Sequence, residues 1–467
     1  MNPDHPLFGG GVSETVLNPA VLIVVLLAGV LIWILPRKKA IAPFLAAALL
    51  IPIDQVLLIR PAHFTMLRVL VLFGIIRILK DRISAKRPLL SGGMNKIDIA
   101  VILLTLFIAV NGVLLFQESG AAIYQLGNLY TVFGVYFLLR FLIRDEEDVV
   151  RTIQTLACVA AIVAAIMTYE FATGHNPYAL LGGARAEWYA ALAMRNNRFR
   201  AQGPFAHSIL AGTFGAVLMP LFVALWWKSK KYRTIAVMGV ISTAVITLTC
   251  NSSTAAVAYA GGVMALCLWP VRRWMRAIRW GIVLALVSLH LVMKAPVWNL
   301  IARIDITGGS SGWQRYMLID QCIHHFGDWW LLGAKDTSFW GWDMWDTANQ
   351  YVATCDSSGL LPFLFFLAVL VYGFKYLGRA RQAAKCRKKA LFIWALGSAL
   401  FANVVAFFGI SYFDQTQVAW YCFLAMIPPV VSVRPKRGMN QVRLEVPADE
   451  ASTVPQLAEQ SVYMDSR

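Results

Sequence analysis

The stretch VLNPAVLIVVLLAGVLIWILPRKK, residues 16–39, shows a feature that repeats along the whole chain. An apolar run from Val16 to Leu35 is followed almost at once by Arg37, Lys38 and Lys39. A helix of about 20 apolar residues crosses a hydrocarbon core of about 30 Å. Basic residues collect on the cytoplasmic side of such helices. We therefore expect a membrane span that stays in the protein rather than a cleaved leader.

Similar apolar runs occupy most of the 467 residues, of which 58% are hydrophobic and 14% charged. Soluble domains are about 45–50% apolar, so the sequence predicts an all-α polytopic membrane protein. Twelve or thirteen spans are expected, because the second and third apolar runs could instead form one re-entrant pair. The expected spans are 16–35, 41–59, 64–79, 98–116, 125–143, 152–171, 205–227, 234–250, 254–270, 280–297, 357–377, 390–410 and 414–432.

The connections between these runs differ in charge, and every second one is basic. The positive-inside rule places the basic connections in the cytoplasm, the N-terminus outside and the C-terminus inside. It also accounts for most of the net charge of +17, and we expect no nucleic-acid partner. Residues 1–432 would form the membrane domain and 433–467 a disordered cytoplasmic tail. Two long connections, 172–204 and 298–356, fall on the outer side.

The first outer connection ends in RNNRFR, residues 195–200, where arginines oppose the charge bias of that side. A guanidinium binds phosphate oxygens in a bidentate manner, so Arg195, Arg198 and Arg200 are candidate ligands for a diphosphate. The alternative is simple contact with lipid headgroups. His207, just inside the next span, is either functional or a neutral, hydrogen-bonded residue.

The second outer connection contains a predicted helix from about Gly312 to Phe326. It carries Arg315 and the candidate general bases Asp320 and His324. The neighbouring histidines 324 and 325 point about 100° apart on a helix, which disfavours a metal site. Cys322 and Cys355 both face outward on this topology and could pair.

Tryptophans are concentrated in the same connection, among carboxylates and amides. Flat apolar rings beside polar groups suit a sugar, so Trp340, Trp342, Trp345 and Asn349 are candidate sugar-binding residues, and Asp346 a third candidate base. The alternatives are interfacial anchoring of the tryptophans or a compact outer cap.

Three patches resemble the O-antigen ligase/polymerase-like superfamily. RFRAQGPFAHSILAG (198–212) resembles its Arg-x-x-Gly-x-Phe entry segment, and GWQRYMLIDQCIHHFGDWWLLGAKDTSFWGW (312–342) its arginine-bearing outer helix and the following turn. DTANQYVATCDSSGLLPFLFF (346–366) is similar to its re-entry into the next span. In topology, the resemblance extends over about residues 95–430.

The resemblance implies a membrane glycosyltransferase at the outer face of the bacterial inner membrane. Its donor would be a polyprenyl-diphosphate-linked glycan, bound by Arg198 or Arg200 and by Arg315, without a metal or other cofactor. Membrane lipids and other polysaccharide-assembly proteins would be partners. The chain departs from the ligase pattern at Ala348, where ligases carry histidine, and at Thr254, where the family has arginine.

These departures favour a member that assembles exopolysaccharide, with Asp346 or a loop histidine as the base. We expect a repeat-unit polymerase. The alternatives are a ligase that transfers glycan to an acceptor, a lipid-linked glycan transporter, and a non-catalytic membrane scaffold.

Overall fold

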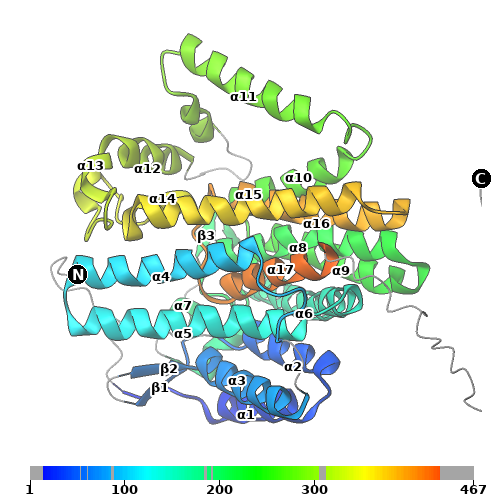
Figure 1. Ribbon diagram of the computed structural model, residues 1–467. Coiled ribbons are helices and arrows are strands. Elements are labelled where there is room, and N and C mark those ends of the chain that lie inside the picture. The colour runs from blue at the N-terminus through cyan, green and yellow to red at the C-terminus, as the bar shows by residue number, and fades with distance from the viewer. Residues whose placement is uncertain are drawn as a thin grey trace, which may run out of the picture. The chain divides into compact units, whose positions relative to one another are not determined.

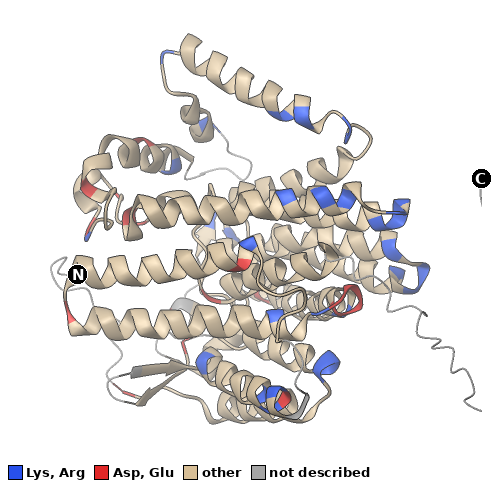
Figure 2. Ribbon diagram, in the orientation of Figure 1, with Lys and Arg blue, Asp and Glu red and all other residues tan. Residues whose placement is uncertain are grey.

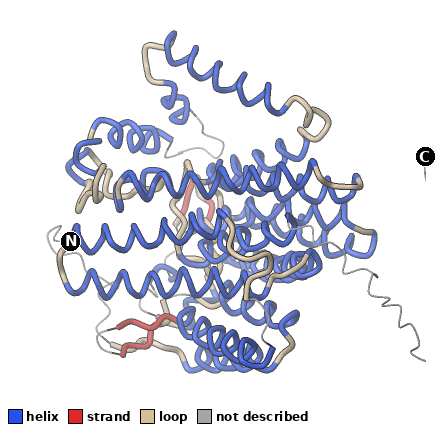
Figure 3. Tube along the Cα trace, in the orientation of Figure 1, coloured by secondary structure: helices blue, strands red, loops and turns tan. Residues whose placement is uncertain are grey.

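Helices form nearly all the regular structure in the computed structural model, which describes residues 14–52, 54–59, 62–85, 89–183, 187–190, 193–303 and 312–431 (Figures 1 and 3). The long helices are α1 (Pro19–Ile34), α2 (Arg37–Leu50), α3 (Met66–Ala85), α4 (Lys96–Phe116), α5 (Ser119–Leu142), α6 (Glu146–Thr173), α8 (Ser208–Lys228), α9 (Arg233–Thr249), α10 (Ser253–Cys267), α11 (Met275–Val292), α15 (Leu360–Gln382), α16 (Arg387–Ala406) and α17 (Asp414–Val431).

Eight helices in the described part of the chain are long and apolar enough to cross a membrane. They are α4, α5, α6, the segment Lys230–Thr249 that includes α9, and α8, α11, α15 and α16. The helices α1 and α10 are apolar but shorter. The protein is therefore an all-α, multi-pass membrane protein.

The segment between α2 and α3 differs from the expected pair of spans. The predicted span 41–59 ends as a helix at Leu50, and residues 56–59 form a strand. Strand β1 (Val56–Ile59) pairs antiparallel with β2 (Ala62–Thr65). Pro52 lacks the N–H that would continue the helix, and Val56 and Ile59 favour extended backbone.

The core of the bundle is α8, which packs against α6, α9, α10 and α16. Almost the whole apolar length of α8 is buried. Glycines allow this close approach: a Cβ at Gly212 would lie 2.1 Å from the Sγ of Cys250, and one at Gly215 2.8 Å from Ile246. In contrast, no residue of α11 is buried, and Figure 1 shows this helix standing apart from the bundle.

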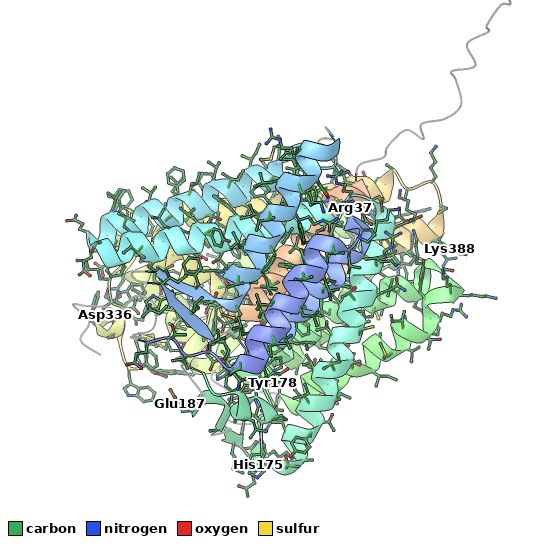
Figure 4. The ribbon with its side chains drawn as sticks, turned by 90° about the horizontal axis from the view of Figure 1, so that it is seen from below. Arg37, His175, Tyr178, Glu187, Asp336 and Lys388 are labelled. Carbon is green, nitrogen blue, oxygen red and sulfur yellow. The ribbon has the colours of Figure 1, made fainter. Side chains whose placement is uncertain are left out.

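Basic residues gather at one end of the helices, on the right of Figure 2. Figure 4 shows Arg37 and Lys388 toward that end, with Asp336 and Glu187 on the opposite side. Buried ion pairs tie the basic end together: Arg140 to Asp98 at 2.9 Å, and Arg37 to Asp148 at 2.7 Å. The alternation of charge seen in the sequence is thus a separation in space.

The two long connections contain short elements. In the first lie η1 (Pro177–Leu181), α7 (Glu187–Ala190), β3 (Met194–Arg195) and β4 (Arg198–Phe199). In the second lie η3 (Val297–Arg303), α12 (Gly312–His324), α13 (Phe326–Trp329), η4 (Ser338–Trp340) and α14 (Gln350–Ser358). One further turn, η2 (Lys230–Tyr232), precedes α9. The helix predicted from about Gly312 to Phe326 ends at His324, and Phe326 begins α13. The predicted tail, 433–467, lies outside the described residues.

Candidate functional site

The arginine-rich segment 195–200 is a tight β-hairpin. Arg195 pairs with Arg198 across the turn formed by Asn196 and Asn197. Both asparagines have positive φ, 52° and 57°, which is the conformation required by a two-residue type I′ turn and tolerated by asparagine. The hairpin rests on the α9–α10 turn, where Asn251 Nδ2 donates to the carbonyl of Arg195 at 3.1 Å.

A buried carboxylate holds the segment that follows the hairpin. Glu170, near the end of α6, accepts hydrogen bonds from the backbone N–H of Gln202 at 3.0 Å and of Gly203 at 2.7 Å. It also accepts one from Asn176 Nδ2 at 3.2 Å. Gly203 has φ of 58°, in the left-handed region that favours glycine. These bonds position Arg200, which lies two residues before Gln202, near the N-terminal end of α8.

The second arm of the site is α12, which brings in Arg315. This side chain is buried, and its Nε donates to the carbonyl of Gly409 at 3.2 Å. Gly409 lies in the α16–α17 connection, and Thr254 Oγ1 at the start of α10 also contacts its carbonyl, at 3.4 Å. Segments distant in sequence therefore meet around one guanidinium.

Arg195, Arg200 and Arg315, which we call the arginine cluster, lie close enough to repel one another. Burial, together with the charges of Arg195 and Arg200 and against an opposing effect of Asp346, lowers the pKa of Arg315 to about 10. Burial, followed by the charge of Arg195, also lowers the pKa of Arg200. Among the described residues, Nε and Nη2 of Arg200 are buried without any hydrogen-bond partner.

An apolar cavity of about 230 Å³ adjoins the cluster. Arg315 lines one side of it, and the other walls come from α10, η3 and the end of α16. The lining residues include Val257, Ile301 and Val405. A cationic cluster beside an apolar hollow suits a ligand with an anionic head and a hydrocarbon part.

His207 stands at the edge of the same cluster as the N-cap of α8. Its Nδ1 accepts a hydrogen bond from the N–H of Ile209 at 3.1 Å. Burial, together with the charges of Arg200 and Arg195, lowers its pKa to about 4. The imidazole is therefore neutral at pH 7 and carries its proton on Nε2. This geometry suits a hydrogen-bond donor better than a base.

The sequence nominated Arg198 for the anion, but the structure places its side chain in solvent. Arg195, on the paired strand, acts on the charges of Arg200, His207 and Arg315 instead. The spacing of arginines along a chain does not reveal which strand of a hairpin lies against the protein.

Of the three candidate bases, only Asp346 is electrostatically linked to Arg315. Loss of water around its carboxyl raises the pKa of Asp346, and Asp343 raises it further, whereas Arg315 lowers it. The residue is nevertheless accessible to solvent. An accessible carboxylate with a raised pKa beside a guanidinium is suited to accept a proton from a hydroxyl.

Asp320 and His324 face other directions. On an ideal helix they lie about 140° and about 180° around the axis from Arg315. Asp320 accepts a hydrogen bond from Trp298 Nε1 at 3.0 Å, and His324 Nδ1 contacts the carbonyl of Asp320 at 2.8 Å. Asp320 therefore belongs to the packing of α12 on η3, and His324 is exposed on α12, so neither belongs to the arginine cluster.

The candidate sugar-binding residues separate into two groups. Trp342 and Trp345 are 84% and 70% exposed. Trp340 is buried and stacks on His325 at 5.3 Å between ring centroids. Asn349 is fully buried: its Oδ1 caps α14 and its Nδ2 donates to the carbonyl of Phe408 at 3.3 Å. Only Trp342 and Trp345 are available to a sugar, and Trp340 and Asn349 are structural.

Cys322 on α12 and Cys355 on α14 are buried in the same apolar cluster. Their thiols are close enough to hydrogen-bond, and this contact, followed by burial, raises the pKa of Cys355. Both are free thiols, as are the other five cysteines. The two residues lie together, but the disulfide considered from the sequence does not join them.

No group of three His, Cys, Asp or Glu residues suited to a metal ion occurs in the described ranges. The chemistry of the site is carried by guanidinium, carboxylate and indole groups. A comparison with models of known protein families and with curated proteins finds no match for this chain.

Proposed function

We propose that the protein is a membrane glycosyltransferase that acts on a polyprenyl-diphosphate-linked glycan. It would join repeat units to one another and so be a repeat-unit polymerase for exopolysaccharide or O-antigen. The observation that carries this proposal is the arginine cluster, in which Arg200 presents two buried nitrogen atoms without a partner. Such cations are costly to bury, and a diphosphate would offset that cost. The adjoining apolar cavity would accept the first carbons of the polyprenyl chain.

The proposed reaction is a single displacement at the anomeric carbon of the donor. The acceptor hydroxyl oxygen forms the new bond to that carbon while the bond from the carbon to the diphosphate oxygen breaks. Asp346 takes the hydroxyl proton. Arg195, Arg200 and Arg315 stabilise the charge that develops on the departing diphosphate, with the neutral His207 as an additional donor. Trp342 and Trp345 hold the acceptor sugar.

The proposed topology has twelve or thirteen spans in the bacterial inner membrane, with the N-terminus outside and the basic end of the bundle inside. The positive-inside rule supports this orientation, because the basic residues gather at one end. The arginine cluster would then lie on the outer side, where lipid-linked glycans are assembled.

A ligase remains the second candidate because the same cluster would bind the same donor. The residue at the position of the ligase histidine is Ala348, which is buried, so a polymerase is preferred. A transporter would place charged residues near the midplane, whereas here the arginine cluster lies at helix ends and connections. A scaffold would have no use for a buried arginine that has two nitrogen atoms without a partner.

The experiment that tests the proposal incubates the purified protein in lipid with a polyprenyl-diphosphate-linked repeat unit and resolves the products by length. A ladder of longer lipid-linked chains is expected. Transfer to an added acceptor without a ladder would indicate a ligase. Folded protein that gives no product with any donor would contradict the enzyme proposal.

A further inference from the structure

We propose a second anion site at the basic end of the bundle, which binds the phosphate of an anionic phospholipid headgroup. It lies where the end of α10, the end of α15 and the start of α16 meet, and it consists of Arg272, Arg381, Trp269 and Trp394. This inference does not depend on the glycosyltransferase proposal.

Two tryptophans form the rigid floor of this site. Trp269 follows α10, and its ring packs edge-to-face on that of Trp394 from α16, with 5.7 Å between centroids. Trp394 Nε1 donates to the carbonyl of Ala265 at 2.9 Å. Since this bond uses the only polar group of the indole, the ring is held in place and offers its face.

An arginine lies over each of these rings. The Cζ atom of Arg272 is 4.2 Å from the centre of Trp269, and that of Arg381 is 5.6 Å from the centre of Trp394. Arg272 also donates from Nη1 to the carbonyl of Trp269 at 3.0 Å. Stacking on an indole orients a guanidinium while its N–H groups stay available at the edges.

The positive charges of Arg272 and Arg381 are close enough for that of Arg272 to repel that of Arg381. Some other cations at this end have carboxylate partners: Arg151 pairs with Glu147 and Asp148, and Lys228 with Glu146. Across the described part of the chain, no Asp or Glu forms an ion pair with Arg272 or Arg381. The pair is therefore a fixed cationic site whose charge the protein itself does not balance.

The surroundings indicate which anion balances it. The exposed Trp274 and Trp280 flank the same connection, at 70% and 69% exposure, and tryptophans of this kind lie at the headgroup level of a membrane. Basic pockets between transmembrane helices at that level bind phospholipid phosphates. The headgroup that fits two arginines best is one with two phosphates, such as that of a diphosphatidylglycerol.

The test is native mass spectrometry of the full-length protein in detergent, with diphosphatidylglycerol as the probe and phosphatidylcholine as the zwitterionic comparison. The wild type is expected to retain diphosphatidylglycerol preferentially. The R272Q/R381Q variant should lose about tenfold or more in affinity, because two charge-assisted contacts are removed. The matched control, R273Q/R276Q, removes two exposed arginines, one from the same connection and one from the first turn of α11, and should bind within about twofold of the wild type.

Thermal denaturation of each variant checks its folding, and the single variants R272Q and R381Q replace the double variant if that one does not fold. Equal losses of diphosphatidylglycerol affinity in R273Q/R276Q and in R272Q/R381Q would overturn the site, since binding would then follow net charge alone. Equal retention by wild type and R272Q/R381Q would also overturn it. Displacement of the lipid by inorganic phosphate at equal concentration would overturn its assignment to a lipid.

Discussion

Arg200 and Arg315 lie close enough, in buried positions, for the charge of Arg200 to lower the pKa of Arg315. Arg200 follows a hairpin in one long connection and Arg315 sits on a helix in the other. Like charges brought together in a poorly solvated place destabilise the folded protein unless an anion joins them. This relationship is the basis of the first prediction.

Replacement of Arg200 by methionine should have opposite effects on stability and on activity. Removal of a buried, unpartnered cation should stabilise the ligand-free protein by about 1 kcal/mol or more, measured as a higher Tm in detergent. Loss of its contacts to the diphosphate should reduce turnover of the lipid-linked donor at least about tenfold. Arg198→Gln, in the same hairpin but exposed, is the control and should change neither quantity. A lower Tm together with full activity would refute the role of Arg200.

Asp346→Asn should lower kcat by about 10²- to 10⁴-fold, since it removes the proposed general base, with little change in Tm because the residue is accessible. The base acts when deprotonated, so the rate should rise with pH through the raised pKa of Asp346. Asp343 contributes to raising that pKa. Asp343→Asn should therefore move the acidic limb of the rate profile to lower pH. An unchanged limb in that variant would exclude Asp346 as the titrating group.

Substitutions of the tryptophans in the second outer connection should have different effects, depending on whether the ring is buried or exposed. Trp340→Ala removes a buried ring and should destabilise the protein by about 3–5 kcal/mol. Trp342→Ala and Trp345→Ala should leave the Tm unchanged and raise KM for the acceptor glycan, without a comparable effect on kcat. Equal KM values in these variants and the wild type would show that the exposed rings serve another purpose, such as contact with lipid.

Glu170→Ala should loosen the segment that carries Arg200. The backbone N–H groups of Gln202 and Gly203 would be left buried without an acceptor, at about 1–3 kcal/mol each. We expect a lower Tm and weaker donor binding, with partial recovery of both in Glu170→Gln, which keeps one acceptor oxygen. Glu147→Ala, at an exposed position of the same helix, is the control. Donor affinity that is unaffected in folded Glu170→Ala protein would contradict this positioning role.

A mild thiol oxidant should join Cys322 to Cys355, since the two thiols are already in contact. Mass spectrometry of the alkylated protein should show the loss of two hydrogen atoms and of two alkylation sites. Cys322→Ser should abolish the product, and Cys158→Ser, on α6, should not. A link between other cysteines would contradict the packing of α12 on α14.

Much of the architecture was predictable from local pattern. Apolar runs long enough to cross a membrane must be helical in lipid, and the helices from α4 to α17 follow these runs closely. The segregation of basic residues to one end likewise follows from the order of the connections along the chain. The charge bias of the connections made Arg200 a candidate, whereas Arg315 became one only through the resemblance of its helix to a segment of a known family.

The sequence by itself thus determined the helical bundle, its two chemically different ends and the kind of group that its site would offer. Only the tertiary structure decided which residues meet: Arg195 rather than Arg198, and Asp346 rather than Asp320 or His324. It also showed that Trp340 and Asn349 are internal. The physical reason is that burial and hydropathy are local properties of a run of residues, whereas a binding site depends on the rotation of each helix and on contacts between segments distant in the chain.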